Sequence, residues 1–459
     1  MFQRFINSIV HLITNTFFRR IDVVGDENIP SDGPVIFAGN HPNALMDGWL
    51  LTARCGRRPL HFVANAKLWK YPLLGRMLDA TGAVPVYRRE EHDGEVDNSG
   101  AFDRLFDVIE SGNCIGVFPE GVSHTESQLA KLKTGTARIA LTVAARGKVS
   151  VTIIPCGLNY IHRDRFRSQV LIEFGEPIVI GDAWIEKFRA DERSAIRELT
   201  DFLANSLKAV TLNAPDWSTL RFIQTARRLY KPAAAHLTPA TYVELNRRFV
   251  KTWERSGKEP EMLAFRARIE DYQSRLEALG LKDYQLRQKI SVGKAFRRLM
   301  GRSILAMLLL PVAIPGLLLH LPVGWVAAIV GEKFSYETDD VATLKVFAAV
   351  ALLPLLYLVA AFLIGSYFGL GWAIAAAVIF VVSFSTSLWV IEAQATLLAS
   401  MISLLRRTRL RSEIDDLHAI RAELVETVRQ LADRFSDPAS PRIFTPDHFK
   451  PTGAADVMK

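Results

Sequence analysis

The sequence predicts an α/β fold: a layered domain with a mixed sheet flanked by helices, followed by a helical connector and a helical transmembrane region. Three observations predict it. Between residues 21 and 180, short apolar runs alternate with stretches of helical periodicity, the pattern of strands and helices packed in layers. Residues 183–302 are charged and helical in pattern. Two later runs, 303–331 and 346–391, contain no Asp, Glu, Lys or Arg, and a bilayer-spanning helix needs only about 20 such residues.

Composition indicates an anionic partner and gives no sign of a metal. The 459 residues carry a formal net charge of +8, with a pI near 9.3 and 49% hydrophobic residues. This charge fits a bilayer surface, nucleic acid or phosphorylated substrates, but no recognised nucleic-acid module accompanies it. Cys55, Cys114 and Cys156 lie far apart without a Cys-x-x-Cys pair. Neither a disulfide framework nor a zinc site is therefore predicted.

Residues 1–20 have the pattern of an amphipathic helix that ends in Arg19 and Arg20. They lack the basic region, compact apolar core and cleavage site of a signal peptide. Two placements have equal weight. The helix is either an interfacial amphipathic helix at the membrane surface or a helix packed on the protein's own core.

The α/β domain is assigned to residues 21–182. Its expected strands are 35–38, 60–64, 84–87, 114–118, 151–158 and 170–174. Its expected helices are 44–54, 68–79, 101–111 and 132–145. The motifs described next all fall at the ends of expected strands, where loops from separate strands can converge on one cleft.

The first motif is Asn40-His41-Pro42-Asn43-Ala44-Leu45-Met46-Asp47. It places a histidine and a carboxylate close together after a buried strand. A positioned histidine is the usual general base near neutral pH, and a carboxylate can orient its ring. Alone, the pair is also compatible with a structural histidine and with an Asn40 that caps the following helix.

Three further motifs follow later strands. The segment 82–89 ends in Arg88 and Arg89, whose planar guanidinium groups suit a phosphate. Phe118-Pro119-Glu120-Gly121 combines a rigid turn, a carboxylate and a conformationally free glycine, and Ser123-His124 follows it. The segment 154–160 closes another strand and contains Pro155, which predicts an edge strand or a bulge.

In this order, the four motifs resemble those of the glycerolipid acyltransferase family: Asn-His followed by Asp, Gly-x-x-Pro-x-x-Arg, Phe-Pro-Glu-Gly, and a late strand with proline. Five residues rather than the usual four separate His41 from Asp47, and Val-Ser-His replaces the usual Thr-Arg-Ser after Gly121. Both departures are similar to the branch with fungal-type glycerol-3-phosphate and dihydroxyacetone-phosphate acyltransferases and bacterial relatives. A regular helix would turn Asp47 away from His41, so we predict that a loop or local bulge brings them together.

The resemblance implies transfer of a fatty acyl chain from acyl-CoA or acyl-carrier protein to a hydroxyl of a phosphorylated glycerol. The two departures from the usual motifs favour glycerol-3-phosphate as this acceptor. It implies His41 as general base, Asp47 as the residue that orients it, and no covalent acyl-enzyme, metal or cofactor. Phosphate binding falls to Arg88 and Arg89. The other substrate-binding residues that it implies are Glu120, Gly121, His124 and Lys133.

Three alternatives stay open at this point. The acceptor can be lysophosphatidate or dihydroxyacetone phosphate, because the sequence does not reveal the shape of the pocket. The protein can be a phospholipid-remodelling transacylase, which needs no CoA. It can also be a non-catalytic lipid-binding scaffold, for which the longer His–Asp spacing is the only support.

The rest of the chain is assigned to a helical connector (183–302), a transmembrane region (303–391), a cytoplasmic helical segment (392–435) and a flexible tail (436–459). In the connector, the basic pair Arg247-Arg248 is expected to be solvated. No chemical motif is recognised there.

Basic clusters flank both ends of the transmembrane region. The positive-inside tendency therefore predicts an integral membrane protein with both flanks, and the catalytic domain, on the cytoplasmic face. Two cytoplasmic flanks require an even number of crossings. The first apolar segment contains Pro311, Pro315 and Pro322, so a kinked span or a re-entrant hairpin is expected there. The mildly acidic loop 332–345 is compatible with the outward side.

Overall fold

The computed structural model describes residues 2–56, 59–88, 97–232, 235, 237–279, 281, 283–286, 292–335, 337–409, 411–437 and 442–444. The chain divides into two compact units. Unit 1 consists of Met1–Leu220, Leu237–Arg247 and Ser335–Thr343. Unit 2 consists of Arg221–His236, Arg248–Phe334 and Leu344–Lys459. Most of the predicted flexible tail lies outside the described residues.

Unit 1 is built on a mixed sheet, which confirms the predicted fold class. Among the described residues the sheet has eight strands in the order β1-β7-β6-β2-β5-β3-β4, and β8 also pairs with β6. Strands β6, β2, β5, β3 and β4 run parallel, whereas β7 and β8 are antiparallel to β6 and β1 is parallel to β7. The strands are β1 (Phe18–Val24), β2 (Val35–Gly39), β3 (Leu60–Asn65), β4 (Val84–Val86), β5 (Cys114–Val117), β6 (Val151–Tyr160), β7 (Ser168–Phe174) and β8 (Ile178–Ile180).

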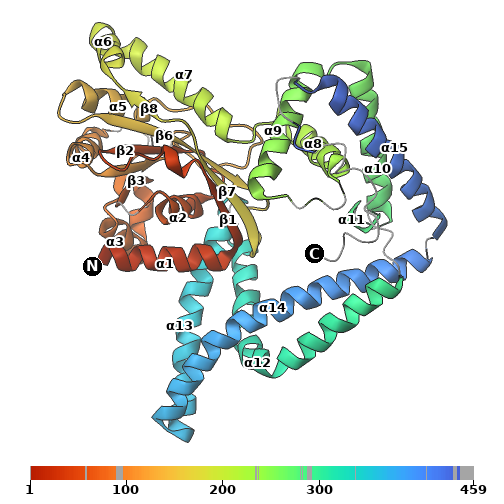
Figure 1. Ribbon diagram of the computed structural model, residues 1–459. Coiled ribbons are helices and arrows are strands. Elements are labelled where there is room, and N and C mark those ends of the chain that lie inside the picture. Colours follow the sequence, from red (N-terminus) through yellow and green to blue (C-terminus); the bar gives the residue numbers. More distant parts are fainter. Residues whose placement is uncertain are drawn as a thin grey trace. The chain divides into compact units, whose positions relative to one another are not determined.

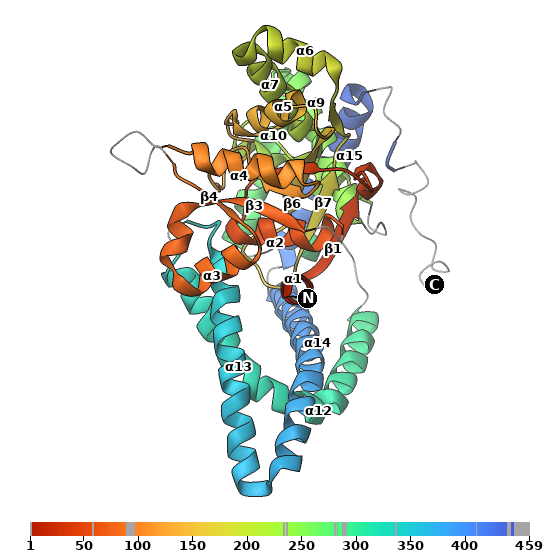
Figure 2. The ribbon, with the colours of Figure 1, turned by 90° about the vertical axis from the view of Figure 1, so that its left-hand side faces the viewer.

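Helices cover both faces of this sheet (Figures 1 and 2). One face carries α1 (Phe2–Phe17), α2 (Ala44–Arg54) and α3 (Pro72–Ala80). The other carries α4 (Ser99–Glu110), α5 (Gly135–Ala145), α6 (Asp182–Ala190) and α7 (Glu192–Val210). Two short 3-10 helices, η1 (Asp26–Asn28) and η2 (Ala66–Lys70), complete the connections.

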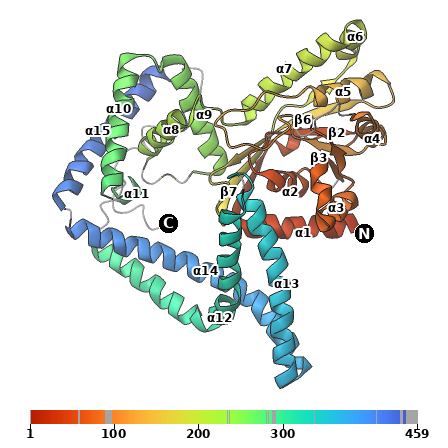
Figure 3. The same cartoon turned by 180° about the vertical axis from the view of Figure 1, so that it is seen from behind.

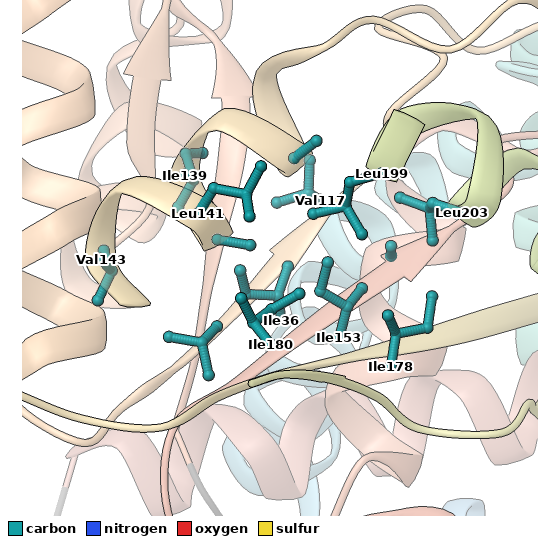
Figure 4. Packing of buried hydrophobic residues seen from close by; sticks show 14 of the residues in the cluster. Ile36, Val117, Ile139, Leu141, Val143, Ile153, Ile178, Ile180, Leu199 and Leu203 are labelled. Carbon is teal, nitrogen blue, oxygen red and sulfur yellow. The ribbon is translucent and has the colours of Figure 1, made fainter. Parts of the chain in front are cut away.

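The main core lies between the sheet and the helices α5 and α7 (Figure 4). Ile36 of β2 and Ile153 of β6 are fully buried there, against Leu141 and Leu199 of the two helices. All five residues of β2 are buried, as expected for a parallel strand covered on both faces. Because each such aliphatic side chain contributes about 2 kcal/mol when buried, this core fixes the strand that carries the first motif.

Helix α1 packs on the protein itself. Its residues Ile6 and Val10 are buried with Ala53 of α2, whereas Ile9 and Leu12 remain 38% and 68% exposed. Strand β1 begins at Phe18, directly after the helix, and pairs with β7 about 150 residues later in the chain.

Pro155 lies in an interior strand, so the prediction of an edge strand or bulge is wrong. On one side, β6 pairs continuously with β2. On the other side, β6 pairs with β8 up to residue Ile153 of β6, and with β7 from residue Cys156 of β6 onward. Pro155 sits in this gap, where a missing N–H costs no ladder hydrogen bond, and its carbonyl accepts from Gly175 N–H at 2.8 Å.

A distant part of the chain joins unit 1 through Arg247. This residue lies in α9 (Pro239–Ser256), and its guanidinium donates to both carboxylate oxygens of Glu173 on β7, at 3.0 and 2.6 Å. The expectation that Arg247 is merely solvated is therefore wrong. A bidentate pair of this kind is among the stronger side-chain interactions.

Unit 2 is helical. It contains most of α8 (Trp217–Tyr230), the end of α9 and nearly all of α13 (Val341–Phe368). Its other helices are α10 (Pro260–Ala278), α11 (Asp283–Leu286), α12 (Val292–Lys333), α14 (Leu370–Arg409) and α15 (Arg411–Phe435). Ion pairs link α10 and α15, including Arg434 with Glu261 at 2.6 Å. A groove of about 440 Å³ between these two helices contains none of the motif residues.

Three helices of the described residues are long and apolar enough to cross a membrane: Met307–Lys333, Val341–Phe368 and Leu370–Leu388. Helices α13 and α14 form an antiparallel hairpin that turns at Gly369, and α12 bends sharply partway along its length (Figure 3). Helix α12 packs along α14. These features agree with the predicted apolar segments and with a kink in the first of them.

The kink in α12 has a local cause. The hydroxyl of Ser383 on α14 donates to the carbonyl of Val312 at 2.6 Å and accepts from Gly316 N–H at 2.6 Å. It thus stands between the two partners of one helical hydrogen bond, beside Pro315. Both backbone groups remain satisfied, as a segment surrounded by hydrocarbon requires. A Cβ on Gly316 would lie 2.4 Å from Ser387 Oγ, so the close approach needs glycine.

Candidate active site

His41 and Asp47 lie within hydrogen-bond distance although five residues separate them in the sequence. His41 follows β2, and Asp47 belongs to the first turn of α2. The distance from His41 Nδ1 to Asp47 Oδ2 is 2.9 Å. Ala44 has a φ of +41°, in the left-handed region that residues other than glycine rarely adopt. The predicted local irregularity is therefore found at Ala44, where it accommodates the extra residue.

The carboxylate of Asp47 is fully buried and accepts hydrogen bonds from three groups. Oδ2 is bound by His41 and by the N–H of Asn43 at 2.7 Å, and Oδ1 accepts from the Tyr160 hydroxyl at 2.5 Å. Burial raises the pKa of Asp47, and these hydrogen bonds lower it in part. Because an ionised carboxylate only accepts, Nδ1 of His41 carries the proton and Nε2 the lone pair. This is the tautomer that a general base requires.

Stacking fixes the plane of the His41 ring. The ring of Phe118 lies 4.0 Å away, centroid to centroid, at an interplanar angle of 6°. The ring of Phe62 is nearly parallel to that of Phe118, with centroids 6.0 Å apart. The His41 side chain is 16% exposed, so the ring is held firmly and still reaches solvent.

Asn40 extends the sheet instead of capping the helix. Its side-chain amide donates to the carbonyl of Leu158 at 3.2 Å, and its Oδ1 accepts from Leu158 N–H at 2.7 Å. The side chain thus acts as one more residue pair of the β2–β6 ladder. Asn43 occupies the N-cap position of α2, without a side-chain cap hydrogen bond. The Asn-His pair therefore fixes where β2 ends and the loop that carries His41 begins.

Glu120 connects the loop after β5 to the loop after β2. The residue is 2% exposed. Its Oε1 accepts from the backbone N–H of His41 at 2.8 Å, and its Oε2 accepts from Ala130 N–H at 2.7 Å and pairs with His124 Nε2. Both carboxylate oxygens are thus engaged within the protein.

His124 and Lys133 lie beside the same turn. The hydrogen bond to Glu120 is the main cause that raises the pKa of His124, and its backbone N–H donates to the carbonyl of His41 at 3.1 Å. Gly121 has a φ of +79°, and a Cβ there would lie 3.3 Å from Lys133 Cγ. The stem of Lys133 therefore packs over Gly121, so the structure brings together six of the predicted site residues.

Arg88 and Arg89 are the two residues predicted to bind the acceptor phosphate. Arg88 follows β4, whose end lies at the same edge of the sheet as the end of β2, with β5 and β3 in between. No described contact joins Arg88 to His41 or Glu120. Arg89 lies outside the described residues. Their assignment to the acceptor phosphate stays a prediction.

Sequence reasoning assigned no site role to Tyr160, which it placed only near the cleft, and missed Arg163. The guanidinium of Arg163 donates to the carbonyls of Pro42, His124 and Thr125, at 3.3, 3.4 and 3.4 Å. It thereby spans both loops, and burial lowers its pKa. The available signal was positional: Tyr160 ends β6, which runs parallel to β2 and next to it, so both strands end at one edge of the sheet.

A small pocket of about 40 Å³ lies beside His41, Glu120 and His124. The segment Thr211, Leu212 and Asn213, which follows α7, forms part of its wall. Asn213 Oδ1 accepts from Leu129 N–H at 2.9 Å. Residues beyond the α/β domain assigned from sequence therefore border the candidate site.

The loop that precedes α13 also belongs to unit 1 and adds negative charge. Asp339 is 3% exposed, and its Oδ1 is buried without a hydrogen-bond partner among the described residues. Burial raises the pKa of Asp340, an effect to which Asp339 and Glu337 add, whereas the charge of His41 lowers it. Asp339 likewise acts on Arg163. This loop and the His41 site therefore share one electrostatic environment.

Comparisons with known proteins match both parts of the chain to acyltransferase families. Residues 20–159 match the family described as Acyltransferase, and residues 222–440 match the glycerol-3-phosphate acyltransferase 2 C-terminal domain. The chain is 36% identical over 279 residues to glycerol-3-phosphate O-acyltransferase 2 of Saccharomyces cerevisiae, covering 57% of this chain and 38% of that protein. It is 34% identical over 289 residues to glycerol-3-phosphate O-acyltransferase 1 of the same yeast, covering 60% and 38%.

A third relative aligns over more of its length. An uncharacterized acyltransferase of Schizosaccharomyces pombe is 27% identical over 448 residues, which covers 76% of this chain and 66% of that protein. By contrast, the chain spans about two fifths of the length of the two yeast glycerol-3-phosphate acyltransferases. Together with the four motifs in order, these matches identify an acyltransferase domain in residues 20–159, followed at residues 222–440 by a domain of the glycerol-3-phosphate acyltransferase 2 C-terminal type.

Proposed function

We propose that this protein is a membrane-bound O-acyltransferase that transfers a fatty acyl chain from a thioester, of acyl-CoA or acyl-carrier protein, to a hydroxyl of glycerol-3-phosphate. The single observation that carries the proposal is the His41–Asp47 pair, with Nδ1 bound to a buried carboxylate at 2.9 Å. The similarity to two glycerol-3-phosphate O-acyltransferases supports the choice of acceptor.

The reaction needs one base and no covalent intermediate. Nε2 of His41 takes the proton of the acceptor hydroxyl as its oxygen forms an ester bond to the acyl carbon. The carbon–sulfur bond breaks, and the leaving thiolate receives the proton back from the imidazolium. Asp47 stabilises the imidazolium formed between these steps. All atoms then end in the acyl glycerophosphate and the free thiol.

Glu120 has a structural role in this mechanism. Because its oxygens are bound by His41 N–H, Ala130 N–H and His124, it acts by holding the backbone of His41. Among the described residues, His124 and Lys133 supply positive charge next to the Gly121 turn, where the phosphate of the acceptor would bind. Arg88 and Arg89 remain candidates at the same edge of the sheet.

The membrane topology that we infer has two crossings, α13 and α14, with α12 as a re-entrant helix. The bend in α12, the hairpin at Gly369 and the basic flanks support it (Figure 3). Residues Ser335–Thr343 belong to unit 1, so the start of α13 lies on the same side as His41. The outward placement of loop 332–345 is incompatible with a cytoplasmic catalytic unit, and we place the loop on the cytoplasmic face.

The test uses the full chain in detergent. Transfer from radiolabelled long-chain acyl-CoA, and separately from acyl-carrier protein, is measured with glycerol-3-phosphate, dihydroxyacetone phosphate and lysophosphatidate, for the wild type, His41→Ala and His61→Ala. His61 is the matched control, because its Nδ1 contacts the carbonyl of Gly82 at 3.0 Å and takes no part in the described hydrogen bonds that hold His41 and Asp47. We expect wild-type and His61→Ala proteins to acylate glycerol-3-phosphate and His41→Ala to lose at least a thousandfold in kcat.

The other outcomes separate the rival functions. Turnover of lysophosphatidate alone would replace the acceptor and keep the mechanism. Transfer from a phospholipid donor without any thioester would indicate a transacylase. No transfer with any donor would favour a non-catalytic scaffold, and full activity of His41→Ala would refute His41 as the base.

A further inference from the structure

The carboxylate of Asp47 has a third partner whose role no motif explains. The hydroxyl of Tyr160 donates to Oδ1 of Asp47 at 2.5 Å, whereas His41 binds Oδ2. We propose that Tyr160 is a positioning residue of the acyl-transfer site, which acts through Asp47 and keeps this carboxylate ionised and aligned with His41. The inference deepens the proposed function and rests on it.

The geometry excludes a direct role in the reaction. Tyr160 contacts the oxygen of Asp47 that His41 does not use, so its hydroxyl is two residues removed from the reacting Nε2. Its ring packs against Phe18 of β1, with centroids 5.7 Å apart. The position is fixed by the sheet, since Tyr160 is the last residue of β6 and pairs with Val170 of β7.

The hydrogen bond matters because Asp47 is fully buried. A buried carboxylate without enough donors takes up a proton, because desolvation disfavours its charged form. Burial already raises the pKa of Asp47, and the bond from Tyr160 is one of the contacts that counteract this. In Tyr160→Phe, Oδ1 loses its donor and the pKa of Asp47 rises further. A protonated Asp47 no longer stabilises the imidazolium of His41.

Other charged groups around the pair set the background for this effect. Arg163, which follows β6, interacts with both Asp47 and Tyr160. From the loop after β5, Glu120 binds the backbone of His41 and pairs with His124. From the loop before α13, Asp340 interacts with His41, and Asp339 with Arg163. The substitution of Tyr160 leaves all of these residues in place.

The chain offers a matched control in Tyr272. Its ring is fully buried, and its hydroxyl donates to Asp283 at 3.0 Å in unit 2. Tyr272→Phe therefore removes a tyrosine–aspartate hydrogen bond of the same kind from a place without catalytic residues. In both variants phenylalanine keeps the ring that packs and removes only the hydroxyl.

The experiment measures kcat and the acceptor KM between pH 5.5 and 9 for the full-length wild type, Tyr160→Phe and Tyr272→Phe. Loss of a hydrogen bond to a charged group predicts that the acidic limb of the kcat profile moves upward by about one pH unit, with roughly a tenfold lower kcat at neutral pH. The KM should stay within about twofold, because the hydroxyl of Tyr160 is bound to Asp47 and its ring packs against Phe18. Tyr272→Phe should leave the profile unchanged. Superimposable profiles for all three proteins would overturn the proposal, as would a change confined to KM.

A second readout does not depend on turnover. Diethyl pyrocarbonate modifies neutral imidazole, and peptide mass spectrometry follows the modification of His41 as a function of pH. The pH at which modification of His41 is half-maximal should change in Tyr160→Phe and stay the same in Tyr272→Phe. Equal midpoint pH values in all three proteins would overturn the proposal. A wild type that transfers no acyl chain would refute the proposed function, whereas the midpoints would still decide whether Tyr160 acts on the pair.

Discussion

The backbone N–H of His41 donates a 2.8 Å hydrogen bond to the carboxylate of Glu120. Through this bond, the loop after β2 and the loop after β5 hold each other in place. His124 N–H returns a bond to the carbonyl of His41 at 3.1 Å. Glu120, the acid of the Phe-Pro-Glu-Gly motif, thus joins two loops of the protein. Its substitution should therefore have effects that differ from those of a substrate-binding residue.

Glu120→Gln should reduce kcat by at least tenfold and lower the Tm. A glutamine keeps the size, but its amide nitrogen would face either the N–H of His41 or that of Ala130. An unsatisfied buried donor costs about 1–3 kcal/mol. The measurements are steady-state kinetics and thermal unfolding, with exposed Glu126→Gln in the same loop as the control. A raised KM for the acceptor at unchanged kcat and Tm would instead show that Glu120 binds substrate.

Ala44→Gly should stabilise the protein. Ala44 has a φ of +41°, a conformation that costs a non-glycine residue about 1–3 kcal/mol, more than the flexibility that glycine adds to the unfolded chain. We expect a gain of about 0.5–1 kcal/mol in the free energy of unfolding, with kcat retained. Ala53→Gly in the same helix should instead lose about 1 kcal/mol. Chemical denaturation of both variants tests this, and equal losses would show that Ala44 is not strained.

The His124–Glu120 contact should make stability depend on pH. The folded state raises the pKa of His124 above its ordinary value of 6.5. The stabilisation is therefore complete below about pH 6.5 and is lost as the pH rises through the higher folded value. The Tm difference between the wild type and His124→Asn should be larger at pH 5.5 than at pH 8.5. A larger difference at the alkaline pH would contradict this assignment.

The Arg247–Glu173 pair should have a measurable coupling energy. Its side chains are 14% and 20% exposed, and bidentate contact predicts about 1–2 kcal/mol in a double-mutant cycle with alanine at both positions. The Arg20–Asp22 pair, with Arg20 49% exposed, provides the control and should give less than about 0.5 kcal/mol. Indistinguishable coupling energies would mean that Arg247 does not anchor α9.

The sequence allowed much of unit 1 to be predicted, because its signals are local. The expected helix 44–54 coincides with α2, and the six expected strands all occur. Strands β1 and β8 were not predicted, since the first three residues of β1 were assigned to the preceding helix and β8 has only three residues. Pro155 was misplaced because the partners of β6 are set by β7 and β8, which lie later in the chain.

The residues of the site were predictable where they belong to one contiguous motif. They were not predictable where the fold brings them together from distant parts of the chain. The approach of His41 to Asp47 was predicted because both residues belong to one contiguous motif, whereas the contact between Asp47 and Tyr160 joins residues more than one hundred positions apart. Arg163 and the segment at Thr211 reach the site only through the order of the strands. The paired role of Arg247 likewise depends on Glu173, which no periodicity connects to it.

Unit 1 is discontinuous in the chain, and this affects its biosynthesis. The ribosome must complete residues up to Thr343 before the last piece of this unit exists. By then α12 has been synthesised, so the first segment that is long and apolar enough to cross a membrane is made before unit 1 is complete. A fragment that ends at residue 220 lacks Arg247 as well as Asp339, and it is not a substitute for the enzyme in crystallisation or screening. Unit 1, and with it the surroundings of His41, can therefore be completed only after this first apolar helix has been synthesised.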